Sequence, residues 1–164
     1  MTPVRWLLLI STCLAFFGFD LISKSYVVDH ISPWNPIAIF ENVFGVSFSL
    51  EYVKNTGAAL GFFSSMQTAL LWGRVLIIIA LLVYLFRATL SPSRIVSLAF
   101  VLTGAIGNVV DYFLYGHVVD MLHFSFRHYS FAVFNLADSL ISCGVAALLI
   151  GSLREKKLQK IENL

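Results

Sequence analysis

Residues 68–86 read TALLWGRVLIIIALLVYLF, and residues 95–113 read IVSLAFVLTGAIGNVVDYF. Each stretch is almost entirely apolar, and its only charged residue lies toward one end. A helix needs about 20 mostly apolar residues to cross the roughly 30 Å hydrocarbon core of a bilayer. The two stretches therefore predict two membrane-spanning helices, joined by a short connection that contains Arg87 and Arg94.

Two further apolar runs flank this pair, so the pattern extends over the whole chain. The 164 residues are 59% hydrophobic and only 12% charged, whereas a soluble domain carries about 25% charged residues. We therefore expect an all-α membrane protein that forms one integral domain over residues 1–164. Its four spans are predicted at about 6–26, 68–86, 95–113 and 134–151.

The basic residues predict the orientation of these spans. The first run follows Arg5 as a secretory signal would, but it has no small-residue cleavage site, which favours a retained span. Cytoplasmic segments are enriched in lysine and arginine. We therefore place both termini in the cytoplasm and segments 28–67 and 114–133 outside it. The net charge of +2, without a basic aromatic patch, gives no reason to expect nucleic acid as a partner.

Three aspartates from three different spans have nearly the same predicted depth. Asp20, Asp111 and Asp138 each lie 15 to 17 residues from an arginine on the cytoplasmic side, which is roughly 22–26 Å along a helix. Ionisable residues at such a depth are costly and usually functional, although they could instead only hold helices together. Lys24 is expected at the outer interface, where it could pair with a carboxylate, and Arg74 is expected to reach the interface or to neutralise an aspartate.

The outer segment 28–67 contains a strand pattern. Residues 44–52, FGVSFSLEY, alternate between apolar and small or polar side chains, which is typical of a half-buried strand. Two isoleucines, Ile37 and Ile39, precede it, and a turn near Glu41-Asn42 would join two strands. We therefore expect a small extracytoplasmic β-hairpin or sheet, whose exposed edge could pair with an extended peptide.

Carboxylates are the candidate reactive groups. The chain has no Gly-x-Ser-x-Gly motif and no histidine spacing typical of zinc sites, so we expect neither a metal nor another cofactor. Two aspartates in a low-dielectric site share one proton, so one can deprotonate water while the other polarises a carbonyl. Asn135 precedes Asp138 by about one helical turn, and Asn108 precedes Asp111 similarly, so each amide shares a helix face with a carboxylate.

Four ordered motifs cover nearly the whole chain. They are Asp20-x-x-x-Lys24, Asn55-Thr56-Gly57-Ala58-Ala59, Gly107-Asn108-x-x-Asp111 followed by Gly116-His117-Val118-Val119-Asp120, and Phe134-Asn135-Leu136-Ala137-Asp138. In this order they resemble the motifs of lipoprotein signal peptidase, also called signal peptidase II. The resemblance implies that Asp120 and Asp138 form a catalytic pair. It implies a supporting role for Asp20, Lys24, Asn55, Gly57, Asn108, Asp111 and Asn135.

The same resemblance implies a substrate and a setting. The substrate would be a prolipoprotein with diacylglycerol on a cysteine, cut just before that cysteine. The enzyme would act as a monomer among the lipids of the bacterial cytoplasmic (inner) membrane, with its active site toward the outer side. Residue patterns alone do not rank Asp120 above Asp111, because Asp120 is expected in a loop that must fold back toward the membrane to meet Asp138.

Two positions depart from the family pattern, in which glutamine and arginine stand where this chain has Leu21 and Tyr112. The missing arginine removes a cation near the carboxylates, and we expect Arg74, Lys24 or Arg127 to replace it.

Three alternatives stay open at this point: an inactive relative, a small proton-coupled transporter, and a non-catalytic assembly protein. The lack of an internal repeat and the placement of the aspartates toward one face argue against the transporter.

Overall fold

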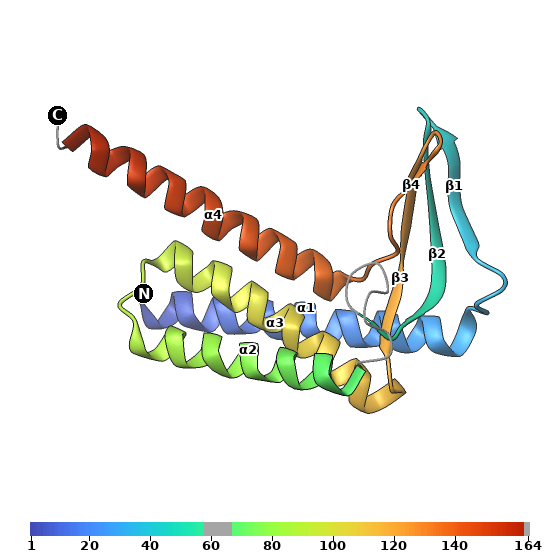
Figure 1. The fold of residues 1–164 in the computed structure, drawn as a ribbon, viewed down its shortest axis with the longest axis horizontal. Coiled ribbons are helices and arrows are strands. Elements are labelled where there is room, and N and C mark those ends of the chain that lie inside the picture. Colours follow the sequence, from blue (N-terminus) through green and yellow to red (C-terminus); the bar gives the residue numbers. More distant parts are fainter. Residues whose placement is uncertain (58–66, 163–164) are drawn as a thin grey trace.

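The computed structural model describes residues 1–57 and 67–162, with side chains up to Glu155. It contains four long helices and a sheet at one end of the helices (Figure 1). The helices are α1 (Pro3–His30), α2 (Gln67–Arg87), α3 (Pro92–Tyr115) and α4 (Leu136–Glu162). All four are long and apolar enough to cross a membrane, which confirms the predicted class of a membrane protein with four long apolar helices.

Local sequence signals explain where α1 and α3 begin and end. Both helices start at a proline, Pro3 and Pro92, where the fixed φ suits the first turn and no backbone N–H is needed. α3 ends at Tyr115, and the next residue, Gly116, caps it: its φ of 76° is left-handed, and its N–H donates to the carbonyl of Tyr112 at 2.9 Å. This turn directs the chain from the end of α3 straight into the sheet.

α3 is the central helix of the bundle. Within its most hydrophobic segment 44% of the residues are buried, compared with 6% in the corresponding segments of α1 and α2. Glycines allow α4 to approach it closely: a Cβ on Gly104 would lie 2.2 Å from the carbonyl oxygen of Ala137, and one on Gly144 would lie 2.6 Å from that of Ser97. The pair α3 and α4 therefore forms a close-packed interface, and the outer faces of α1 and α2 present apolar side chains outward.

The sheet has four antiparallel strands in the order β1-β2-β3-β4. They are β1 (Ile37–Val43), β2 (Val46–Asn55), β3 (Val118–Phe126) and β4 (Tyr129–Ser130). The expected turn at Glu41-Asn42 was placed wrongly: β1 continues to Val43, and the turn is Phe44-Gly45, where both residues have positive φ. Glycine at the second position makes this turn less strained, because it adopts a left-handed φ without a Cβ clash.

The pairing of β2 with β3 contains an irregularity that decides which side chains share a face. Leu50 pairs with Leu122, but the next recorded partners are Val53 with Asp120, so β2 carries one extra residue at this point. Beyond this bulge the odd-numbered residues of β2 oppose the even-numbered residues of β3. Asn55 therefore lies on the same face as Asp120, two residues along the ladder.

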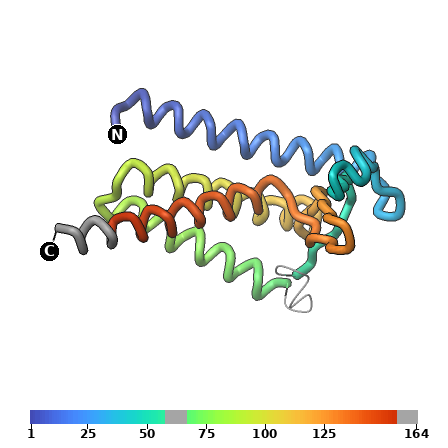
Figure 2. Tube along the Cα trace, turned by 90° about the horizontal axis from the view of Figure 1, so that it is seen from above, coloured from blue at the N-terminus to red at the C-terminus, as the bar shows by residue number. Residues whose placement is uncertain are grey.

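The sheet rests on the end of α1 and on the segment that leads into α4. Val27 of α1 and Ile31, which directly follows this helix, form a buried apolar cluster with Val119 and Met121 of β3. On the next segment, Phe134 pairs with Leu122 of β3 through backbone hydrogen bonds. The start of α1 and the far end of α4 lie at the opposite end of the bundle from the sheet (Figures 1 and 2).

Candidate active site

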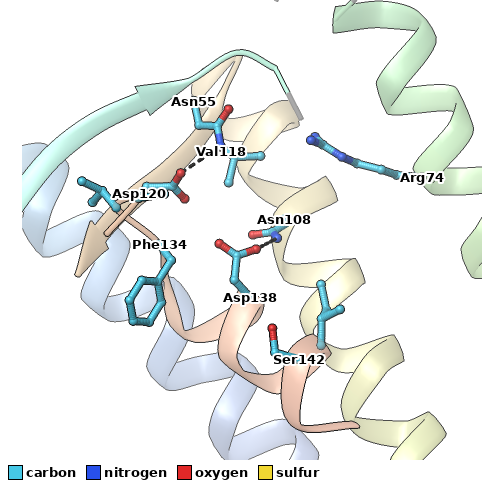
Figure 3. A pocket seen from close by; sticks show the side chains of 11 residues that line it. Asn55, Arg74, Asn108, Val118, Asp120, Phe134, Asp138 and Ser142 are labelled. Atoms are coloured by element: carbon cyan, nitrogen blue, oxygen red, sulfur yellow. Dashed lines mark hydrogen bonds between the residues drawn. The ribbon is translucent and has the colours of Figure 1, made fainter. Parts of the chain in front are cut away.

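A cavity of about 310 Å³ lies where α3, α4, β2 and β3 meet. Asp120 and Asp138 both line it, and their carboxyl groups point into the same space (Figure 3). Asn55, Asn108 and Arg74 add polar atoms to its wall. The remaining lining residues are Val118, Ala132, Val133, Phe134, Ile141 and Ser142. The site thus combines two carboxyl groups with a wall of both polar and apolar side chains.

Asp120 lies near the start of β3 and is only 3% exposed. The expectation of a loop at this position was wrong, because residues 118–126 pair with β2 over the length of the strand. Two amides donate to its two oxygens: Asn135 Nδ2 to Oδ1 at 2.8 Å and Asn55 Nδ2 to Oδ2 at 2.9 Å. Burial and the neighbouring carboxylate of Asp138 raise the pKa of Asp120 to about 7. Near neutral pH this carboxyl group is therefore available in its protonated form.

Asp138 lies in the first turn of α4 and is fixed by a reciprocal cap. The Asn135 Oδ1 accepts from the backbone N–H of Asp138 at 2.8 Å, and Asp138 Oδ2 accepts from the backbone N–H of Asn135 at 3.3 Å. This is the arrangement of a capping box, in which two residues three apart satisfy unpaired helix donors. Asn108 Nδ2 of α3 donates to the other oxygen of Asp138 at 2.8 Å. Helix capping therefore sets the direction of this carboxylate.

Behind the cavity lies a fully buried group of three charged side chains. The Lys24 ammonium is 2.7 Å from Asp20 Oδ2 and 2.7 Å from Asp111 Oδ2. All three side chains are 2% exposed or less. The expectation that Lys24 reaches the outer interface was wrong, because its ammonium points into the bundle, where the two carboxylates compensate its charge.

The two carboxylates of this group also hold backbone next to the cavity. Asp111 Oδ2 accepts from the N–H of Val119 at 3.2 Å, and Asp20 Oδ1 accepts from the N–H of Ala137 at 3.0 Å. Val119 precedes Asp120, and Ala137 precedes Asp138. Space for this contact is limited, since a Cβ on Gly107 would lie 2.9 Å from Asp20 Oδ2. A glycine is thus required where α1 meets α3.

Three cations were expected to replace the arginine that the family has at Tyr112, and the structure separates them. Lys24 contacts Asp111 directly. Arg74 Nη2 instead donates to the carbonyl of Gly57 at 2.9 Å and lines the cavity. Arg127 lies in the turn after β3, with its guanidinium 5.4 Å from the ring of Phe126. Lys24 is therefore the cation that compensates the Asp111 carboxylate.

The structure brings all nine residues of the expected site into the cavity wall or into the hydrogen-bonded layer behind it. Gly57 takes part through its backbone N–H, which donates to Asn55 Oδ1 at 3.0 Å. Sequence reasoning missed the backbone of Val119 and Ala137 and the cavity position of Arg74. The first two carry no side-chain signal, whereas the arginine within an apolar helix was itself a signal, because such a residue usually faces a polar cavity.

The chain is similar to proteins of one family in sequence and to solved membrane-enzyme structures in fold. The model of a family described as "Signal peptidase (SPase) II" matches residues 12–154. The lipoprotein signal peptidase of Nostoc punctiforme is 40% identical over 149 residues, which cover 89% of each chain. That of Chlamydia trachomatis is 38% identical over 165 residues, covering 96% of this chain and 98% of the relative. A solved structure titled "Bacterial membrane enzyme structure by the in meso method at 2.3 A resolution" matches with a TM-score of 0.80 and 26% identity, covering 90% of this chain and 88% of that one.

Proposed function

The chain belongs to the signal peptidase II family and is an aspartic-type lipoprotein signal peptidase, and we propose that Asp120 and Asp138 are its catalytic pair. Family membership decides against the proton-coupled transporter and the non-catalytic assembly protein. One observation carries the residue assignment: two carboxyl groups from β3 and α4 point into one cavity, and both accept from Asn135, Asp120 from its amide and Asp138 from its backbone N–H. An inactive relative would not need to keep both groups in this arrangement.

The environments of the two carboxyl groups support different roles in hydrolysis. The raised pKa of Asp120 favours its neutral form near pH 7, so this residue polarises the scissile carbonyl by donating a hydrogen bond. Asp138 accepts from Asn108 and from the Asn135 backbone, which fixes its oxygens beside the cavity, and its role is that of the base that takes a proton from water. As the water oxygen attacks the carbonyl carbon, Asp120 gives its proton to the carbonyl oxygen. When the C–N bond breaks, the proton held by Asp138 passes to the leaving amine and Asp120 takes its proton back.

The substrate that we propose is a prolipoprotein with diacylglycerol on a cysteine, cut just before that cysteine. The apolar side chains of the cavity wall and the apolar outer faces of the helices suit a lipid-modified chain that approaches from the bilayer. We place both termini in the cytoplasm, because Arg5, Arg87 and Arg94 then lie on the cytoplasmic side. The catalytic pair would then open toward the outer side of a bacterial inner membrane.

The assignment is tested with purified protein and a diacylglyceryl-modified precursor, followed by mass measurement of the products. Asp120→Asn and Asp138→Asn should each reduce cleavage by about 10³-fold or more, because each removes a proton-transfer group. Asp29→Asn serves as the matched control, since Asp29 is an exposed carboxylate of α1 whose side chain contacts Ser25. Thermal unfolding in detergent checks that all three variants fold.

Two outcomes would contradict the assignment. Cleavage at the normal rate by either cavity variant would show that its carboxyl group is not catalytic. A loss of equal size in the Asp29→Asn control would show that the assay responds to surface charge and not to the cavity.

A further inference from the structure

Each of the three asparagines around the catalytic pair is held at its oxygen and donates from its nitrogen. Asn55 Oδ1 accepts from the Gly57 N–H, and Asn135 Oδ1 accepts from the Asp138 N–H. Their amide nitrogens then donate to Asp120. In both cases the donor that holds the oxygen is a backbone N–H, which has a fixed position.

Asn108 differs, because its oxygen accepts from two side chains: the Asn135 amide at 3.1 Å and the charged ammonium of Lys24. Lys24 Nζ lies 3.3 Å from Asn108 Oδ1, and Asn108 Nδ2 donates to Asp138 at 2.8 Å. The opposite amide orientation would place the NH2 group against the ammonium and the carbonyl oxygen against the Asp138 carboxylate. Both contacts would be repulsive in a low-dielectric interior. The charge of Lys24 and the Asn135 amide therefore both favour the orientation in which Asn108 donates to Asp138.

Lys24 is also connected to the backbone on both sides of the catalytic pair. Through Asp111 it reaches the N–H of Val119, the neighbour of Asp120. Through Asp20 it reaches the N–H of Ala137, the neighbour of Asp138. Three short routes thus run from one buried ammonium to the two elements that carry the catalytic groups.

We propose that Lys24 is a positioning residue for catalysis, which orients the Asn108 amide toward Asp138 and sets the placement of β3 relative to α4. The proposal rests on the catalytic role of Asp120 and Asp138. It differs from a role in stability alone, for which the ammonium would need only to compensate the two carboxylates. A positioning role predicts a loss of kcat that remains when the charges are removed together and the protein folds normally.

The test uses two variants, because Lys24→Met alone leaves two carboxylates buried without a cation. The second variant combines Lys24→Met with Asp20→Asn and Asp111→Asn. It removes all three charges while the new amide oxygens can still accept from the N–H groups of Val119 and Ala137. We expect this triple variant to retain a cooperative thermal transition, with kcat reduced about 100-fold and KM changed less than about threefold.

A double-mutant cycle with Asn108→Ala separates positioning from general stabilisation. If Lys24 acts through Asn108, adding the triple change to Asn108→Ala should lower kcat by less than about threefold further. A full additional 100-fold loss, or a folded triple variant with kcat near that of the unmodified enzyme, would overturn the proposal. Removing the ion pair at the other end of α3, by Arg94→Met with Glu155→Gln, is the matched control and should leave kcat unchanged.

Asp120→Asn and Asp138→Asn are assayed alongside these variants. If they are inactive and the triple variant cleaves normally, only the role of Lys24 is wrong. If either of them cleaves normally, the catalytic assignment itself fails.

Discussion

The two ends of the α3–α4 pair hold charge in opposite ways. Near the start of α4, Lys24 and its two carboxylates are 2% exposed or less and are linked through Asn108 to Asp138 of the proposed catalytic pair. At the other end, Arg94 of α3 pairs with Glu155 of α4, and these side chains are 36% and 46% exposed. A surface pair contributes little to stability because water already solvates both ions. The buried charges of Lys24, Asp20 and Asp111 are costly unless they are fully paired. Their presence at the site agrees with the proposed positioning role of Lys24.

The largest expected effect is on stability, at the buried end. Lys24→Met leaves Asp20 and Asp111 without a cation, so we expect a destabilisation of about 3–5 kcal/mol, as for other buried pairs that lose one partner. Arg94→Met at the exposed end should cost less than about 1 kcal/mol. Unfolding in detergent measures both variants. Equal losses would remove the distinction between the two ends.

The next effect concerns the close contact of the two helices at the site end. Gly104→Ala places a Cβ 2.2 Å from the carbonyl oxygen of Ala137, so we expect a destabilisation of about 1–3 kcal/mol and reduced cleavage as Asp138 shifts. Gly151→Ala is the matched control on α4, because nothing lies within 4 Å of a Cβ there. It should be neutral or stabilise by up to about 1 kcal/mol. Thermal unfolding and the cleavage assay distinguish the two.

A third effect is a pH dependence that only the site end should show. The pKa of Asp120 is raised to about 7, and the proposed mechanism needs this group protonated, so kcat/KM should fall as pH rises through about 7. The Asn55 hydrogen bond lowers this pKa, so in Asn55→Leu the decline should move to higher pH, with a rate about 10-fold lower because one donor is lost. Rate measurements from pH 5 to 9 test this. A decline that moves to lower pH in Asn55→Leu would contradict the role of Asp120 as the proton donor.

The smallest effect is expected when the exposed ion pair is removed completely. Arg94→Met with Glu155→Gln should change stability by less than about 1 kcal/mol and leave the pH profile of cleavage as it was. The same unfolding and rate measurements apply. A shifted profile would mean that the end of the bundle opposite the sheet also acts on the carboxyl groups of Asp120 and Asp138.

The four helices could be predicted from the sequence because the apolar runs are long and each ends near a charged or turn-forming residue. The strand β3 could have been recognised as well. Residues Leu122 to Phe126 alternate between apolar and polar side chains, but this signal is short and follows directly after an apolar helix. The bulge in β2 has no such signal, although it decides that Asn55 and not Lys54 faces Asp120.

The arrangement of the side chains in the site could be predicted from the sequence only in part. Equal depth along three helices correctly grouped Asp20, Asp111 and Asp138. The position of Lys24 was misjudged, because helical spacing gives the depth of a residue and not the side of the helix that faces the bundle. Its link to Asn108, 84 residues away, depends on how α1 packs against α3, and no local pattern records that.

The backbone pairing of Phe134 with Leu122 has a consequence for how the chain can vary in length. The N–H of Leu122 donates to the Phe134 carbonyl at 2.7 Å. This pairing joins the two ends of the segment between Leu122 and Phe134, directly before the cap of α4. The turn at Arg127-His128 lies beyond this pairing, at the tip of the sheet. We therefore expect insertions or deletions at this turn to leave the separation of the Asp120 and Asp138 carboxyl groups unchanged.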